Sequence, residues 1–450
     1  MDKPGRELTS SYAARTPTRH LSSASPPLQP AFPSVAQLLP YDVLVRIFEQ
    51  SARAPRQQDW GGLLCAWQSN EDVCRLALVC SSWRLPAEHV LYRSCSLLSA
   101  KDAASFIETT KRRTDLAAKV QFLVVGLSEE ETWPSSDEEG VTGGMMTGKT
   151  QAETSALMVA ALAACSRLRH FQVRPLHDSA REGLLAALAE THLETLICSP
   201  RLRKPDVEWT GCLFRRVDIV KLVLPTLRNF EFDAWTNPSD HNDPAYVEEV
   251  PVSPTFPSTI LSSLTTLRLR SDISDDHLFA LLAACGSTLE IADIYVERIV
   301  APAPAAEALS HALGTLRELR WTTNPPIEGF AEVNLSPNPP FDRILPRFQV
   351  LNSLSISATD VSPSILSLLP ACLVDVEVQA YTYRGPFKFS EEMIKTLANR
   401  KEKFTLKRFT VCDSEEVWSD ENVAAMTGSC AARGIAFSFI ADEDREVDSR

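Results

Sequence analysis

The residues with the most recognisable chemistry lie near the end of the first third of the chain. The segment from Gly143 to Thr150 reads GGMMTGKT and has the spacing GxxxxGK[ST] of a phosphate-binding loop. In such a loop, successive backbone N–H groups surround the phosphate oxygens, the lysine reaches the phosphates, and the hydroxyl binds magnesium. Lys149 and Thr150 would take the last two roles.

The surrounding sequence argues against that interpretation. A phosphate-binding loop follows a buried strand directly, whereas the strand expected before this segment ends near Leu127. The fifteen residues after it are mostly polar or acidic, and Asp137, Glu138 and Glu139 would repel phosphate. We therefore expect residues 128–150 to form an acidic, glycine-rich loop inserted into a larger domain. Nucleotide binding is the weaker alternative.

Other patterns that would support catalysis are missing from the sequence. It has no GxSxG or HExxH pattern, and its eight histidines and eleven cysteines lack zinc-ligand spacing. We therefore expect no enzyme activity, no metal and no cofactor.

Scattered cysteines without a CxxC pair suit reduced thiols in the cytoplasm or the nucleus. The net charge of −13 disfavours nucleic acid and anionic membranes as partners, and the longest apolar run is too short to cross a bilayer.

Most of the chain repeats one apolar pattern, L-x-x-L-x-L, and helix-like runs such as DDHLFALLAACGS lie between many copies. A period of two indicates a strand with one buried face, and a period of 3.6 indicates a helix packed on it. A strand and a helix every 22 to 37 residues predict a mixed α+β or α/β solenoid over residues 99–440. GIAFSFI, near Gly434, would close the series. The ten copies begin at Val120, Leu168, Leu193, Leu227, Leu264, Leu289, Leu316, Leu351, Leu373 and Leu406.

Shorter segments flank this repeat region. Residues 1–34 are rich in Ser, Thr, Pro and Ala, and residues 441–450 are acidic, so we expect both to be disordered. Between Leu39 and Tyr92 the pattern predicts short helices, the first starting at Pro40 and the third at Pro86. Their apolar faces are too large for so few residues to bury, which indicates a docking module that needs a partner.

The string LPYDVLVRIF, followed by LALVCSSW and LY, resembles the F-box, the motif by which receptor subunits of SCF-type ubiquitin ligases bind the Skp adaptor. An F-box followed by degenerate leucine-rich repeats is similar to the F-box/LRR class in its loose fungal form. The resemblance covers residues 36–95 and implies a small all-helical F-box over residues 35–98. Between Phe48 and Val79 the chain is longer than that family's pattern by about ten residues, an insertion that costs little loop entropy.

The resemblance implies a substrate-recognition subunit that docks on the Skp adaptor, and through it on cullin, and holds an unknown target protein. In the alternative, a repeat scaffold without a ligase role, the helices would only cap the solenoid and bury Ile47 and Phe48 on its first repeat. The predicted adaptor-binding residues are Leu39, Pro40, Val43, Leu44, Ile47, Phe48, Leu76, Val79, Cys80, Trp83, Leu91 and Tyr92.

In each repeat, the residues between the apolar positions should face the concave side of the sheet. Charges of both signs alternate along them, which suits a protein or peptide partner better than a lipid or a nucleic acid. The predicted target-binding residues are His170, Gln172, Arg174, Asn229, Glu231, Asp233, Arg268, Arg270, Asp293, Tyr295, Glu318, Arg320, Asp375, Glu377 and Arg408.

Overall fold

The structure is a computed structural model that describes residues 39–52, 70–127, 148–174, 176–198, 224–234, 261, 263–271, 275–296, 302–323, 339–379, 389–399, 405–413 and 418–441. Residues 1–34, the chain between the first two helices, residues 128–147 of the predicted insertion 128–150 and the acidic residues after Ala441 lie outside these ranges, so the predictions made for them stay predictions. Residues 148–150 of that insertion are not loop, because they begin helix α7 (Gly148–Ala164).

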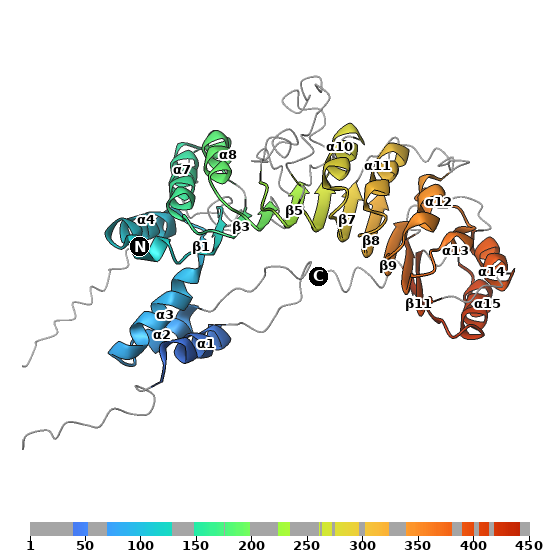
Figure 1. Ribbon diagram of the computed structural model, residues 1–450, viewed down its shortest axis with the longest axis horizontal. Helices are drawn as coiled ribbons and strands as arrows, with labels where there is room; N and C mark the ends of the chain where they lie inside the picture. The colour runs from blue at the N-terminus through green and yellow to red at the C-terminus, as the bar shows by residue number, and fades with distance from the viewer. Residues whose placement is uncertain are drawn as a thin grey trace, which may run out of the picture.

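Twelve parallel strands form one sheet in which every strand pairs with its neighbours in the sequence. The sheet curves into an arch, with the strands along its inner side and the helices along its outer side (Figure 1). This arrangement is the mixed helix-and-strand, solenoid-like fold that the repeats predict. The strands are β1 (Ser94–Leu97), β2 (Phe122–Val125), β3 (His170–Val173), β4 (Thr195–Cys198), β5 (Asn229–Ala234), β6 (Thr266–Ser271), β7 (Ile291–Val296), β8 (Glu318–Thr323), β9 (Ser353–Ser357), β10 (Asp375–Gln379), β11 (Arg408–Asp413) and β12 (Ala436–Ala441).

Most strands are followed by a helix or a short 3-10 turn on the outer layer. The helices are α1 (Tyr41–Ala52), α2 (Asn70–Ala77), α3 (Ser81–Arg93), α4 (Ala100–Arg112), α5 (Thr114–Ala117), α7 (Gly148–Ala164), α8 (Arg181–Ala189), α10 (Asp275–Cys285), α11 (Pro302–Ala308), α12 (Pro340–Ile344), α13 (Ile365–Leu368), α14 (Phe389–Asn399) and α15 (Asp420–Ala431). The 3-10 turns are η2 (Asp178–Ala180), η5 (Leu309–Ala312), η6 (Leu345–Arg347) and η7 (Ala358–Asp360).

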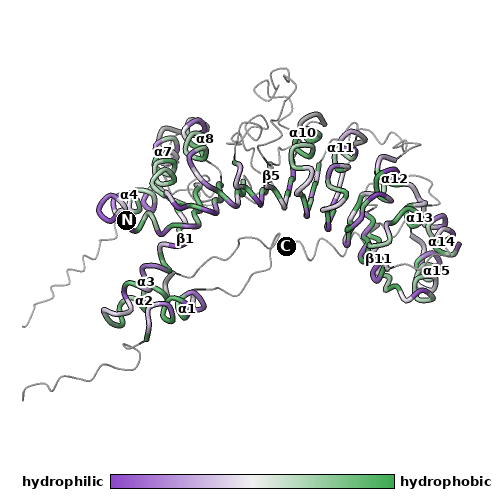
Figure 2. The backbone as a smooth tube through the Cα atoms, in the orientation of Figure 1, coloured by the Kyte–Doolittle hydropathy of each residue, from purple (hydrophilic) through white to green (hydrophobic). Residues whose placement is uncertain are grey.

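The repeated apolar pattern produces the strands because its apolar residues stack in register. Leu196 of β4 lies beside Phe230 of β5, which lies beside Leu267 of β6, and all three are buried. No single repeat could bury these side chains, so neighbouring repeats share one continuous core. Apolar and polar residues alternate along the strands accordingly (Figure 2).

All ten predicted repeat copies contain a strand, and GIAFSFI forms β12. The sheet begins earlier than predicted, because β1 lies inside the range 35–98 and pairs with β2. Its sequence, SCSL, lacks the repeat pattern, so only pairing with the next strand reveals it. Ala441 belongs to β12 rather than to the acidic tail.

The first three helices form a compact unit, which we call the N-terminal helical module (residues 39–52 and 70–93). Helix α1 begins at Tyr41, one residue after the predicted Pro40. Helix α3 begins at Ser81, so the prediction that Pro86 starts the third helix is wrong. Pro86 lies inside α3, where its ring removes one backbone hydrogen bond but is itself buried in the module.

Gly126, directly after β2, provides a test of the packing between repeats. Its φ of +155° disfavours other residues, and an added Cβ would lie 2.3 Å from Cβ of Arg174 in the next repeat. We expect Gly126→Ala to lower the free energy of unfolding by about 1–3 kcal/mol, measured by urea denaturation. Gly428→Ala is the control, since an added Cβ there meets nothing within 4 Å in helix α15. A Gly126→Ala variant as stable as wild type would contradict this close approach.

Candidate protein-interaction surfaces

The N-terminal helical module has a small hydrophobic core of its own. Leu44 and Phe48, one helical turn apart on α1, are fully buried, and the Phe48 ring lies 5.3 Å from the Trp83 ring. Val73, Ala87 and Val90 complete this core, which is separate from the core of the sheet. The module therefore folds on itself without laying its apolar face on the first repeat.

The same helices leave other large apolar side chains exposed. Among the described residues, seven large apolar side chains are exposed, and six of them belong to this module. The seventh is Phe279 of α10. Such a concentration is typical of an interaction surface. We call it the apolar docking surface, and its residues are Tyr41, Val43, Ile47, Leu78, Val79 and Leu85.

The predicted adaptor-binding residues divide between this surface and the module's interior. Val43, Ile47 and Val79 are exposed, as is Pro40. Leu44 and Phe48 are buried, so they shape the surface from beneath and do not reach a partner directly. Tyr92 packs against the core of the sheet, which separates it from the rest of the set. The half-buried members are Leu39, Leu76, Cys80, Trp83 and Leu91.

Tyr41, Leu78 and Leu85 were not among the predicted residues. Tyr41 is the first residue of α1 and Leu78 directly follows the last residue of α2, and a period of 3.6 is hardest to assign at helix ends. Leu85 was hidden by the wrong start of α3. A helix assigned over the whole run Ser81–Arg93 would have included it.

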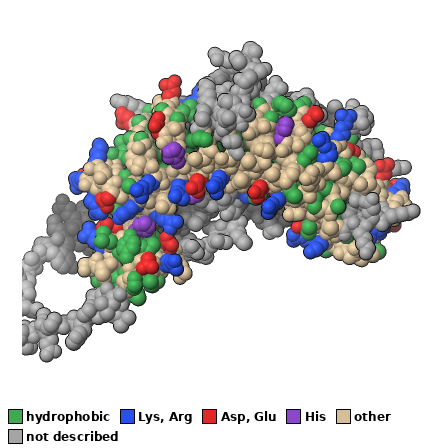
Figure 3. Space-filling model, in the orientation of Figure 1, with side chains coloured by type: hydrophobic (Ala, Val, Ile, Leu, Met, Phe, Trp, Pro, Cys, Tyr) green, Lys and Arg blue, Asp and Glu red, His purple; other side chains and the backbone are tan. Residues whose placement is uncertain are grey.

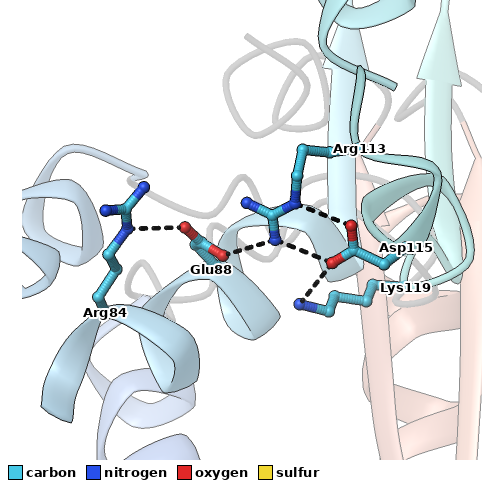
Figure 4. Close-up of polar contacts among 5 residues, drawn as sticks. All are labelled: Arg84, Glu88, Arg113, Asp115 and Lys119. Atoms are coloured by element: carbon cyan, nitrogen blue, oxygen red, sulfur yellow. Dashed lines mark hydrogen bonds and ion pairs between the residues drawn. The ribbon is translucent and has the colours of Figure 1, made fainter. Parts of the chain in front are cut away.

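A network of ion pairs joins the module to the repeats (Figure 4). Glu88 of α3 accepts from Arg84 Nε at 3.0 Å and from Arg113 Nη2 at 3.2 Å. Arg113 also binds both carboxylate oxygens of Asp115 at 2.8 Å, and Lys119 lies 3.8 Å from the same carboxylate. Burial raises the pKa of Glu88, but its two arginine partners outweigh burial and hold that pKa below the ordinary value.

Helix α3 also continues into the sheet without a linker. It ends at Arg93, and β1 starts at Ser94. Arg93 donates to the Gln121 side chain at 3.2 Å, just before β2, and forms an ion pair with Glu49 of α1. The position of the docking surface relative to the sheet is therefore fixed by helix α3 and by the polar contacts of its residues Glu88 and Arg93.

The inner face of the sheet carries most of the predicted target-binding residues, in rows that cross the strands. One row places Glu231, Arg268, Asp293 and Arg320 side by side on β5 to β8. Arg268 lies 3.8 Å from Glu231, and Arg320 lies 3.8 Å from Asp293. The alternating charges predicted for this face are thus largely neutralised by cross-strand pairs, each worth about 0.2–1 kcal/mol.

On β3 to β5, three polar side chains of this face form an uncharged hydrogen-bonded group. Nδ1 of the half-buried His170 lies 3.0 Å from the hydroxyl of Thr195, and the Asn229 amide donates to that hydroxyl at 3.2 Å. Partial burial lowers the pKa of His170, with Arg169 and Arg93 acting in the same direction against Glu194. His170 is therefore mainly neutral near pH 7.

Beyond β8 the face is a hydrogen-bonded network. Gln379 donates to Ser355 at 2.8 Å and to Glu377 at 2.7 Å. Further along, Arg408 binds both oxygens of Asp375 at 2.6 and 2.7 Å, and this pair lowers the pKa of Asp375. These predicted residues thus satisfy one another and leave few free polar groups to a partner.

The other predicted residues of this face lie at the ends or edges of strands. Glu318 begins β8 and is exposed, and Gln172 is half-buried on β3. Arg174 directly follows β3, and Arg270 of β6 lies in register with Asp233 and Tyr295. All fifteen predicted target-binding residues thus lie on the strands or directly beside them.

Sequence reasoning missed a buried carboxyl group near the end of β9. Asp360 in η7 is 2% exposed and accepts from the Thr323 hydroxyl at 2.6 Å. Burial raises the pKa of Asp360 to about 7, and the hydrogen bond only partly opposes that rise. Its sequence context, ATDVSP, resembles an ordinary turn, so no sequence signal marked it.

The structure also places the remaining candidates. Gly148, Lys149 and Thr150 form the first turn of α7, and residues 143–147 of the phosphate-loop pattern lie outside the described ranges. Within the described ranges, no cluster of three His, Cys, Asp or Glu side chains could hold a metal ion. In the same ranges, every helix is too short or too polar to cross a membrane.

No protein-family model matches the sequence, and no curated protein matches it either. Functional assignment therefore depends on the residues and the geometry described above.

The ion pair between Glu88 and Arg113 should hold the module in place. We expect Glu88→Gln to speed hydrogen exchange of the β1 amides a few-fold, because it removes a contact between α3 and the chain leading into β2. Exchange is measured by mass spectrometry at neutral pH. Glu108→Gln is the control, since Glu108 pairs with Arg112 within α4 and not with the junction. Equal exchange in both variants would contradict a role for Glu88 at the junction.

Asp360 should make the stability of the repeats depend on pH. Its folded pKa exceeds the unfolded value of 3.8, so its contribution is complete below about pH 4 and is lost as pH rises through about 7. We expect Asp360→Asn to stabilise the protein at pH 8 more than at pH 5, by about 2–3 kcal/mol, measured by urea denaturation. Asp375→Asn is the control, since Asp375 stays ionised across this range. If Asp360→Asn changed the free energy of unfolding equally at both pH values, the raised pKa of Asp360 would be refuted.

Proposed function

We propose that this protein is the substrate-recognition subunit of an SCF-type ubiquitin ligase. Its N-terminal helical module would be an F-box that docks on the Skp adaptor, and its repeats would be degenerate leucine-rich repeats that hold a target protein. The observation that carries the proposal is the apolar docking surface, which the module leaves exposed although its own core is complete.

The physics of the docking favours a helical partner. Val43 and Ile47 lie one turn apart on α1, and they are 36% and 41% exposed. Leu78 and Val79 follow α2 and are 86% and 60% exposed. Burying such anchors against a partner typically supplies about 2 kcal/mol each for the central ones. The buried Leu44 and Phe48 would hold α1 rigid beneath them, so that little ordering is needed on binding.

The alternative of a capped scaffold is less well supported. A cap buries its apolar face on the first repeat, whereas Phe48 is buried by the module's own core and Ile47 is exposed. In the ligase role, the repeats would present the target and other subunits would carry out ubiquitin transfer, so the chain needs no catalytic group. The nine described cysteines are free thiols, which suits the proposed location in the cytoplasm or the nucleus.

Substitution of two exposed anchors tests the docking. We expect Ile47→Glu combined with Val79→Glu to weaken binding of the purified Skp adaptor at least about thirtyfold, the loss of one anchor of about 2 kcal/mol. Binding is measured by calorimetry, and folding is checked by thermal denaturation. Exposed positions are chosen because their replacement leaves the buried core intact.

Phe279→Glu is the matched control, because Phe279 is as exposed as Ile47 but lies on α10 in the repeats. It should bind the adaptor as wild type does. Unchanged adaptor affinity in the Ile47→Glu, Val79→Glu variant, or no adaptor binding by wild type, would refute the ligase role.

A further inference from the structure

One edge of the sheet carries a row of residues that directly precede the strands. Their backbone groups are hydrogen-bonded from each repeat to the next, so neighbours in the row lie about 4.8 Å apart. We call this row the basic edge row. In order it contains Arg93, Gln121, Arg169, Glu194, Arg228, Thr265, Glu290, Arg317, Asn352, Val374 and Lys407.

Cations outnumber anions in this row although the chain as a whole has a net charge of −13. Five of its positions are Arg or Lys, and only Glu194 and Glu290 are acidic. Those two acids pair with arginines of the row: Glu194 lies 3.4 Å from Arg169, and Glu290 lies 3.8 Å from Arg317. The arginines nevertheless stay accessible, since the side chains of Arg169 and Arg317 are 59% and 63% exposed.

The excess is concentrated beside the N-terminal helical module. Arg93, Arg169 and Arg228 alternate with Gln121 and Glu194 there, so successive arginines lie about 10 Å apart. Figure 3 shows Lys and Arg side chains gathered along the border between the module and the sheet. The neighbouring inner face offers the uncharged His170, Thr195 and Asn229, so no acidic residue predicted for that face opposes the arginines at this end.

We propose that this end of the basic edge row binds an extended, acidic segment of the target protein. The 10 Å spacing of the arginines is close to one turn of a polyproline II chain, about 9 Å for three residues, so anionic groups at every third position would lie on one face and meet successive arginines. Carboxylates and phosphates share the required chemistry, since arginine binds both through two parallel hydrogen bonds. Arg93 and Arg169 pair with Glu49 and Glu194, but their side chains are still 44% and 59% exposed, so an anionic ligand could meet both together with the exposed Arg228.

The proposal rests on the proposed function only because it names the segment as part of a target protein. The binding test itself uses peptides and not the adaptor. The probes are fluorescein-labelled peptides of twelve residues with matched lengths: one rich in Glu, one with phosphoserines, one rich in Lys and one neutral with Gln. A single-stranded DNA of twelve nucleotides is included. Binding to the full chain is followed by fluorescence polarisation at low and at physiological salt.

We expect the Glu or phosphoserine peptide to bind in a saturable way that weakens with salt, and the Lys and Gln peptides not to bind. Arg169→Gln with Arg228→Gln should weaken that binding at least tenfold. The matched control, Arg112→Gln with Arg347→Gln, removes two exposed arginines from α4 and η6 outside the row and should leave binding unchanged. Preference between the two acidic peptides distinguishes carboxylate from phosphate.

Three results would overturn the proposal: no saturable binding of either acidic peptide up to about 1 mM, equal losses in the two double variants, or tighter binding of the DNA than of both acidic peptides. The adaptor measurement separates this inference from the ligase role. Arg169→Gln with Arg228→Gln should keep adaptor affinity, whereas Ile47→Glu with Val79→Glu should keep peptide binding.

Discussion

Helix α3 packs against two hydrophobic cores at the same time, and the rest of the architecture depends on that contact. Ala87 and Val90 face the core of the N-terminal helical module, whereas Tyr92 reaches the core of the sheet. The helix then becomes the first strand without a break. Because each core requires the same helix in the same place, the apolar docking surface and the repeats keep one orientation, and the ion pairs of Glu88 reinforce it.

The inner face of the sheet is governed by a different constraint, the arrangement of its charges. A curved parallel sheet exposes a long polar face, and an acidic protein must arrange charges on it without repulsion. Here Glu231, Arg268, Asp293 and Arg320 neutralise one another across strands, and Gln379 ties the later repeats together through amide hydrogen bonds. The inner face is therefore largely self-satisfied, while cations remain at the edge beside the module. That division explains how the protein can be acidic overall and still offer a site for an anionic ligand.

Much of this fold could be predicted from the sequence, because its main signal is periodic. Apolar residues at every second position give a strand wherever neighbouring repeats bury them, and each of the ten copies does so. Strand β1 was missed because four residues, SCSL, carry no period and form a strand only through pairing with β2. Pro86 misled the assignment of α3, because proline is common in the first turn of a helix yet is tolerated deeper when its ring is buried.

The candidate sites show the limit of sequence reasoning more clearly. The apolar stripe of α1 indicated a docking surface but could not separate the buried Leu44 and Phe48 from the exposed Val43 and Ile47, since both pairs repeat every four residues. The basic edge row could not be predicted from the sequence for another reason. Its members are 22 to 48 residues apart in the chain and become neighbours only in the folded sheet.

The strictly sequential order of the strands has a consequence for how this protein can vary. Each strand pairs only with the one before and the one after, so adding or deleting a whole repeat toward the carboxyl end would lengthen or shorten the arch by one strand spacing and leave α3 and its two cores unaltered. The apolar docking surface and the length of the sheet are thus separable traits, so a change in repeat number would alter the length of the inner face without altering α1 to α3.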